Sequence, residues 1–136
     1  MRSIEVSIGF IQRDDTYLLQ RRPNTQNKGA AGLIGAFGGK IEIGETPLEA
    51  VCRELREETS LKPSTEDFKE LGSVQVISDR DNMPVKIAAK VFSILIASET
   101  VFTAYEGELV EMARDEIHTN AHLLTPATRA AFEQLI

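Results

Sequence analysis

The order of apolar patterns along this 136-residue chain predicts an α/β or α+β fold, in which helices cover a β-sheet. Alternating apolar residues, typical of half-buried strands, occupy the N-terminal and middle parts of the chain. Two helix-start signals, each a Thr followed by a Pro, stand at Thr46 and Thr125. The length suits one domain, and we expect residues 1–136 to form it.

The N-terminal segment is predicted to form a β-hairpin. Apolar side chains recur at every second position from Ile4 to Phe10, and a polar turn over residues 13–16 precedes a second strand over residues 17–22. Glycines then stand at positions 29, 32, 35, 38 and 39. Residues 27–39 are therefore predicted to be a loop, too flexible for a helix and too small-sided for a core strand. Either another group approaches its backbone closely, or the chain only bends there.

A helix is predicted from Thr46, its N-cap, to about Thr59. Pro47 suits the first helical position, and Glu49 completes a capping box with Thr46. One apolar stripe should pack on a sheet, formed by Leu48, Val51, Cys52 and Leu55. Cys52 is the only cysteine, which excludes an intrachain disulfide and suits a reducing cytoplasm.

The remaining elements follow from the same signals. Residues 73–78 and 85–96 are predicted strands around a polar turn, and residues 108–112 form a short further strand. Thr125 and Pro126 begin a closing helix that continues to Ile136.

Charge and hydropathy exclude two classes of partner. The formal net charge is −6, which disfavours binding to a nucleic-acid polymer. The longest strongly apolar stretch, residues 91–97, is too short to cross a membrane, and the N-terminus lacks the pattern of a signal peptide. We expect a cytoplasmic protein without a membrane partner.

Acidic residues concentrate in one part of the chain: 6 of the 15 glutamates lie between Gly39 and Leu61. On a helix, Glu54, Glu57 and Glu58 share one face and repel one another. A bound hard cation such as Mg²⁺ or Mn²⁺ would relieve that repulsion, and zinc would prefer His and Cys ligands. The alternative is a solvated acidic face with ion pairs within the helix.

Residues 39–61 read GKIEIGETPLEAVCRELREETSL, and this segment resembles the Nudix box, G-x5-E-x7-R-E-aliphatic-x-E-E-x-G-aliphatic. The single departure is Ser60, which replaces the final glycine of the motif. A glycine there would let the helix end through a left-handed residue, so we expect Ser60 to cost on the order of 1 kcal/mol at the helix end.

The resemblance implies an α/β/α sandwich with a mixed sheet between helices. It also implies hydrolysis of a nucleoside diphosphate linked to another moiety, with Mg²⁺ or Mn²⁺ as cofactor. By position in the box, Glu57 and Glu58 match metal ligands, Glu54 matches a metal ligand or base, and Arg53 matches the residue that orients it. Gly38, just before the box, matches a backbone carbonyl ligand.

Candidates outside the box are less specific. Many relatives supply one further glutamate from a loop, which Glu106 matches best, with Glu99, Glu108 and Glu111 as alternatives. Candidate substrate contacts are Arg21, Lys40 and Phe37. Phe37 would otherwise fill the core, and basic strand ends such as Arg21 are usually solvated.

The substrate follows only from the resemblance. Subfamilies that act on ADP-ribose or dinucleoside polyphosphates often carry a Pro or Tyr beyond the box, at positions where this chain has Val76 to Asp79. The expected substrate is therefore a nucleoside triphosphate, unmodified or oxidised, cleaved to monophosphate and pyrophosphate. The alternative is a catalytically silent nucleotide-binding sensor domain. Homodimers are common in the family.

Overall fold

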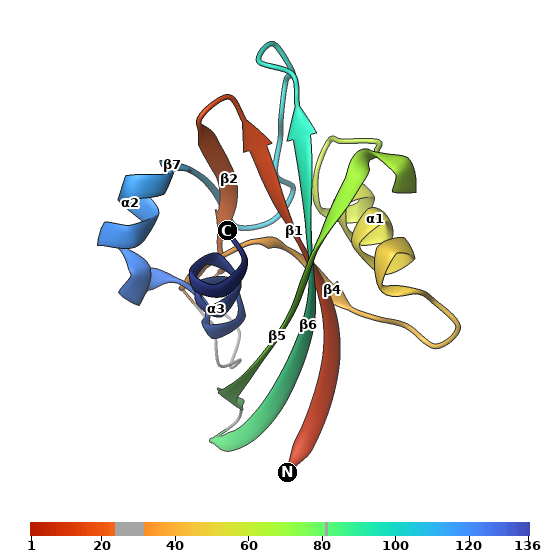
Figure 1. The fold of residues 1–136 in the computed structure, drawn as a ribbon, viewed down its shortest axis with the longest axis vertical. Helices are drawn as coiled ribbons and strands as arrows, with labels where there is room; N and C mark the ends of the chain where they lie inside the picture. The colour runs from red at the N-terminus through yellow and green to blue at the C-terminus, as the bar shows by residue number, and fades with distance from the viewer. Residues whose placement is uncertain (24–31, 81) are drawn as a thin grey trace.

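A mixed β-sheet lies between helices in the computed structural model, which describes residues 1–23, 32–80 and 82–136 (Figure 1). The strands are β1 (Arg2–Arg13), β2 (Thr16–Arg21), β3 (Ile34–Gly35), β4 (Phe37–Lys40), β5 (Phe68–Arg80), β6 (Met83–Ile96) and β7 (Glu108–Ala113). The helices are α1 (Pro47–Glu58), α2 (Arg114–Thr119) and α3 (Pro126–Leu135), with short 3₁₀ turns η1 (Thr65–Asp67) and η2 (Ala121–Leu123). Figure 1 shows α1 on one side of the sheet and α2 and α3 on the other.

Strand β1 lies in the middle of the sheet and pairs with three other strands. The strand order is β3-β2-β1-β6-β5, with β4 also paired to β1 and β7 to β2. Along one edge, β1 runs parallel to β6 over its whole length. Along the other edge it pairs with β4 through residues 6–9 and with β2 through residues 11–13. This arrangement brings β4 next to α1, which packs against both β4 and β1.

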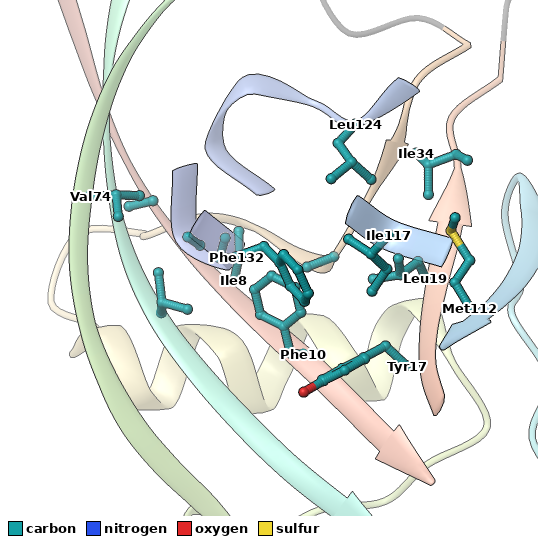
Figure 2. Close-up of a cluster of buried hydrophobic side chains, with 14 residues drawn as sticks. Ile8, Phe10, Tyr17, Leu19, Ile34, Val74, Met112, Ile117, Leu124 and Phe132 are labelled. Atoms are coloured by element: carbon teal, nitrogen blue, oxygen red, sulfur yellow. The ribbon is translucent and has the colours of Figure 1, made fainter. Parts of the chain in front are cut away.

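Apolar side chains fill the space on both faces of the sheet. On the face covered by α3, Phe132 packs in a T-shaped contact on Tyr17, and Ile8 and Phe10 of β1 lie beside it (Figure 2). On the opposite face, Val51 and Leu55 of α1 pack on a second buried cluster of β1, β2, β4 and β6. The alternation of side chains along each strand supplies both clusters.

Helix α1 begins and ends where the sequence predicts. The Glu49 N–H donates to Thr46 Oγ1 at 3.1 Å, and the Thr46 N–H donates to Glu49 Oε1 at 2.9 Å, so the capping box is confirmed. Cys52 is buried on its inner face, and its thiol donates to the Pro63 carbonyl. The N-terminal hairpin, the strand at 108–112 and the closing helix are also confirmed.

The prediction of a loop over residues 27–39 is wrong at residues 34–35 and 37–39, which lie in strands β3 and β4. Its first part, residues 27–31 with Gly29, lies outside the described residues. The expectation that another group approaches this backbone closely is confirmed at Gly39, where the Glu54 carboxylate leaves no room for a Cβ.

Other differences concern length. Strand β5 begins at Phe68, well before residue 73, and carries a bulge between Glu70 and Gly72. No sequence signal predicts helix α2, because it is short and its N-cap, Ala113, has no side-chain oxygen. Among the described residues, no helix is long and apolar enough to cross a membrane.

Candidate active site

The acidic residues of the box meet the glycines of β4 at the C-terminal half of α1. The Gly38 N–H donates to Glu58 Oε1 at 2.9 Å. A Cβ at position 39 would lie 2.5 Å from Glu54 Oε1, so only glycine leaves room for this carboxylate. At Gly38 the backbone has φ +146°, and a Cβ would lie 2.1 Å from the Ser7 carbonyl oxygen. Glycine is therefore required by the backbone at position 38, whereas at position 39 it leaves room for the observed position of the Glu54 carboxylate.

Arg53 fixes the orientation of several carboxylates with one guanidinium. It binds Glu45 through two hydrogen bonds, from Nε at 2.7 Å and from Nη2 at 3.0 Å. Its Nη1 donates to Glu54 Oε1 at 3.0 Å and to Glu57 Oε1 at 3.2 Å. The Lys40 carbonyl also accepts from Nη2, which ties α1 to the end of β4. The planar fork of arginine suits this bidentate geometry, and a lysine could not reproduce it.

Burial changes the proton affinity of the two inner carboxylates. Burial and, secondarily, the charge of Glu54 raise the pKa of Glu58 to about 8. Burial also raises the pKa of Glu54, which the hydrogen bond from Arg53 partly offsets. The hydrogen bonds of Arg53 and of the Glu42 backbone instead lower the pKa of Glu45 to about 2. Burial is thus the largest influence on both inner carboxylates, and the Arg53 hydrogen bond offsets it only in part at Glu54, whereas the Arg53 hydrogen bonds outweigh burial at Glu45.

A cavity of about 570 Å³ opens beside these carboxylates. Glu58, Glu106 and Gly38 line its acidic part. Basic side chains also contribute to its wall, namely those of Arg2, Arg22 and Lys40. Its remaining lining is mostly aliphatic and comes from β1, β6 and the start of α3, including Ile4, Val6, Ile8, Ile87 and Ala127. The cavity therefore offers both charged and aliphatic side chains, as a ligand with a charged group and an apolar ring would require.

The model of the NUDIX domain matches residues 1–131 of this chain. The chain belongs to the Nudix family. The match extends from β1 into α3, so it includes both the box and the elements that line the cavity.

Curated relatives share the central part of this Nudix domain. The ADP-ribose pyrophosphatase of Methanocaldococcus jannaschii is 44% identical over 73 residues, which cover 54% of this chain and 40% of that protein. The CTP pyrophosphohydrolase of Escherichia coli is 38% identical over 68 residues, which cover 50% of this chain and 49% of that protein. The chain thus matches less than half the length of these relatives.

A solved structure extends the likeness to the whole fold. The MutT NUDIX hydrolase from Burkholderia pseudomallei superposes with a TM-score of 0.73 and 27% sequence identity, and the match covers 100% of both chains. The expected mixed sheet between helices is therefore confirmed as the Nudix fold.

The donor set of the box suits a hard divalent cation. Glu54, Glu58 and Glu106 supply carboxylate oxygens, and the charges of Glu54 and Glu106 both raise the pKa of Glu58. Glu57 is turned toward Arg53, and 56% of its side chain is exposed. Across residues 1–23, 32–80 and 82–136, no three His, Cys, Asp or Glu side chains already converge closely enough to hold a metal ion. The chemistry of the donors fits such an ion.

Of the three candidate substrate contacts, the structure places only Lys40 at the cavity. Lys40 lines the cavity, but Arg21 does not: it lies 4.0 Å from Glu108, and its neighbour Arg22 faces the cavity instead. Successive residues of an extended chain point to opposite faces, which explains why Arg22 lines the cavity and Arg21 does not. Phe37 is 0% exposed and packs on Phe102 under α1, so it fills the core and does not reach the cavity.

Among the candidate loop glutamates, only Glu106 is part of the cavity wall. Glu111 pairs with Arg13 and accepts from Thr16, and Glu108 lies beside Arg21, while Glu99 does not line the cavity.

Sequence reasoning missed most of the apolar wall. Ile4, Val6 and Ile8 were assigned to a core face of β1, and the structure shows that this same face lines the cavity. The start of α3 adds Thr125 and Thr128, whose hydroxyls hydrogen-bond to each other at 2.8 Å. The period-2 pattern identifies the face, but only the position of α3 shows that part of it stays uncovered.

The expectation for Ser60 is wrong. Among the described residues, the only non-glycine residues with positive φ are Asp14 and Asn82, so Ser60 is not left-handed. Helix α1 ends instead at Thr59 with φ −137° and ψ 171°, and the chain leaves in an extended conformation that any residue can adopt. Replacing glycine by serine here therefore brings no backbone strain.

Proposed function

We propose that this chain is a divalent-metal-dependent pyrophosphohydrolase that converts a nucleoside triphosphate, unmodified or oxidised, to the monophosphate and pyrophosphate. The observation that carries the proposal is the close approach of Glu54 to Gly39 and of Glu58 to Gly38, because Glu58 and both glycines line a cavity of about 570 Å³. A cavity of this size can enclose a nucleotide.

Under this proposal, the residues of the site would have separate roles in binding the metal and in orienting its ligands. Glu57 and Glu58, with Glu54 and Glu106, would hold Mg²⁺ or Mn²⁺, together with the backbone of Gly38. Arg53 would keep the carboxylate of Glu54 in its orientation through the 3.0 Å hydrogen bond. When bound, the metal would neutralise the phosphates and lower the pKa of a coordinated water.

The substrate itself would lie along the cavity. Arg22 and Lys40 stand at the wall where the phosphates would come, and the aliphatic side chains of β1 and β6 would receive the base. Water would attack one phosphorus of the α–β linkage, and the P–O bond to the bridging oxygen would break. The elements of water then divide between the monophosphate and the pyrophosphate.

The names of the relatives support the reaction type and leave the substrate open, since one is a CTP pyrophosphohydrolase and another an ADP-ribose pyrophosphatase. We favour a triphosphate because positions 76–79 are Val, Ile, Ser and Asp, without the Pro or Tyr found in ADP-ribose subfamilies.

The test is a panel of nucleoside triphosphates, 8-oxo-dGTP, ADP-ribose, nucleotide sugars and dinucleoside polyphosphates with Mg²⁺ or Mn²⁺, with the products identified by chromatography. We expect pyrophosphate and a monophosphate from at least one triphosphate, and loss of turnover in Glu57→Gln and Glu58→Gln. Preferred cleavage of ADP-ribose would contradict the substrate assignment. Binding of nucleotide and Mn²⁺ without any turnover would instead identify a sensor domain.

A further inference from the structure

Residues 97–107, which we call the crossing segment, pass over the C-terminal end of α1. The Ser60 N–H donates to the Thr103 carbonyl at 2.9 Å, and the Thr103 N–H donates back to Ser60 Oγ at 2.9 Å. The Tyr105 N–H donates to the Glu58 carbonyl at 2.8 Å, and Thr59 forms an isolated antiparallel bridge with Ala104. The end of the helix and the crossing segment are thus held edge to edge.

The hydrogen bond from the Thr103 N–H to Ser60 Oγ exists because Ser60 replaces the final glycine of the Nudix box. A glycine at position 60 could make the backbone bond to the Thr103 carbonyl, but it has no oxygen to accept the Thr103 N–H. The serine hydroxyl supplies that acceptor without backbone strain, since α1 ends in an extended conformation. Ser60 therefore adds one contact between α1 and the crossing segment that the usual residue cannot make.

The crossing segment ends in the cavity. Glu106 follows Tyr105 and lines the same wall as Glu58. On its other side, the Glu106 carbonyl accepts from Gln20 Nε2, and Gly107 has φ +67° with no room for a Cβ against the Arg21 carbonyl oxygen. Glu106 is therefore placed between two fixed points, the end of α1 and the end of β2.

We propose that Ser60 is a positioning residue for Glu106: by accepting the Thr103 N–H, it fixes the crossing segment so that the Glu106 carboxylate faces Glu58 at the cavity. This inference rests on the proposed function in one respect, that Glu106 takes part in binding the metal.

Other contacts hold the beginning of the crossing segment and provide a matched control. Ser98 Oγ donates to Asp14 Oδ1, and Arg13 Nη1 donates to the Thr100 carbonyl. Ser98 thus makes a side-chain hydrogen bond to the same segment, but at the end remote from Glu106. A general effect on the segment would follow from loss of either serine, whereas an effect on Glu106 would follow only from loss of Ser60.

The experiment compares Ser60→Ala, Ser60→Thr and Ser98→Ala, each alone and combined with Glu106→Gln. Two quantities are measured: kcat/KM for the best substrate and the affinity for Mn²⁺ alone, from electron paramagnetic resonance titration. We expect Ser60→Ala to lower both on the order of tenfold, as typical for a residue that orients a ligand. Ser60→Thr keeps the hydroxyl and should restore them, and Ser98→Ala should change neither.

The combination with Glu106→Gln separates positioning from a merely structural role. If Ser60 acts through Glu106, Ser60→Ala has no further effect once Glu106→Gln is present. The proposal is overturned if Ser60→Ala lowers Mn²⁺ affinity equally in both backgrounds, or if it has no effect in the wild type. If Ser60→Ala does not fold, the proposal is tested with the other two variants. It then requires that Ser60→Thr binds Mn²⁺ with wild-type affinity and that Glu106→Gln binds Mn²⁺ about tenfold more weakly.

The Mn²⁺ titration also keeps this inference separate from the proposed function. Weaker Mn²⁺ binding in Ser60→Ala and Glu106→Gln, without turnover of any nucleotide, would support the inference and contradict the function. Turnover that is unaffected by Glu106→Gln, with unchanged Mn²⁺ affinity, would contradict the inference and leave the function standing.

Discussion

Arg53 is the residue on which the order of the acidic site depends, because a single guanidinium contacts Glu45, Glu54 and Glu57. Its strongest contact is with Glu45, which does not line the cavity, and the hydrogen bonds that Arg53 donates to that carboxylate raise the pKa of Arg53 further above its ordinary value. Glu45 thus holds Arg53, and Arg53 in turn holds the carboxylates of α1. This two-step arrangement gives Glu45 a role in stability rather than in chemistry.

The pH dependence of stability tests this role. The pKa of Glu45 is about 2 in the folded protein, against an ordinary value of 4.5. Its ion pair therefore stabilises the fold above pH 4.5, and this contribution is lost as the pH falls toward 2. We expect Glu45→Gln to lower the free energy of unfolding at pH 7, and the difference from the wild type to shrink below pH 4.5. Urea unfolding at stepped pH measures it, and a difference independent of pH would contradict the assignment.

The two glycines of β4 predict opposite outcomes for the same substitution. In Gly38→Ala the new Cβ meets backbone, with φ +146°, so we expect a loss of more than about 3 kcal/mol of stability or no folding. In Gly39→Ala it meets only the movable end of Glu54, so the protein should fold while turnover falls on the order of 10²-fold. Circular dichroism and turnover of both variants measure this. Equal stability of the two variants would show that the close approach at Gly38 does not constrain the fold.

At the scale of single residues, sequence reasoning succeeds where the signal is local. Glu54, Glu57 and Glu58 can be grouped because helical spacing alone puts them on one face. The hydrogen bond of Glu58 to Gly38 cannot be deduced this way, since it depends on the pairing of β4 with β1. The expectation for Ser60 is wrong for a related reason, because its contact is with Thr103, a residue distant in sequence.

Among the elements, α1 is the best defined by its sequence. Its start is fixed by the capping box of Thr46 and Glu49 and by Pro47, and its buried stripe follows the helical period. By contrast, the parallel pairing of β1 with β6 joins strands separated by more than half the chain, and no local pattern specifies it. Two of the four residues of strand β4 are glycines, which have low strand propensity, so its strand character depends on pairing with β1.

The capping box makes a prediction at this scale. Thr46→Ala removes the acceptor for the Glu49 N–H at the start of α1, and we expect the free energy of unfolding to fall by about 1 kcal/mol. Turnover should persist, because the carboxylates of the site lie at the other end of the helix. Urea unfolding followed by circular dichroism measures the change. A loss of turnover at unchanged stability would contradict the assignment of Thr46 to capping.

For the whole molecule, metal binding should act on stability. Burial raises the pKa of the half-buried Glu54 and Glu58, and a cation that binds them only in the folded protein stabilises it by about 2.7 kcal/mol at one hundred times its Kd. We expect Mn²⁺ to raise the melting temperature by several degrees in the wild type and much less in Glu58→Gln. Differential scanning fluorimetry over a Mn²⁺ titration measures both. An equal rise in the two proteins would place the ion elsewhere.

The same residues should govern catalysis, and one measurement tests this central claim most directly: the initial rate of Mg²⁺-dependent pyrophosphate release from nucleoside triphosphates. It is made on the wild type, Glu58→Gln and the control Glu66→Gln, whose carboxylate is exposed and outside the cavity. We predict equal rates for the wild type and Glu66→Gln, and a loss on the order of 10²–10⁴-fold in Glu58→Gln. A wild-type rate in Glu58→Gln, or undiminished release in the presence of EDTA, would contradict it.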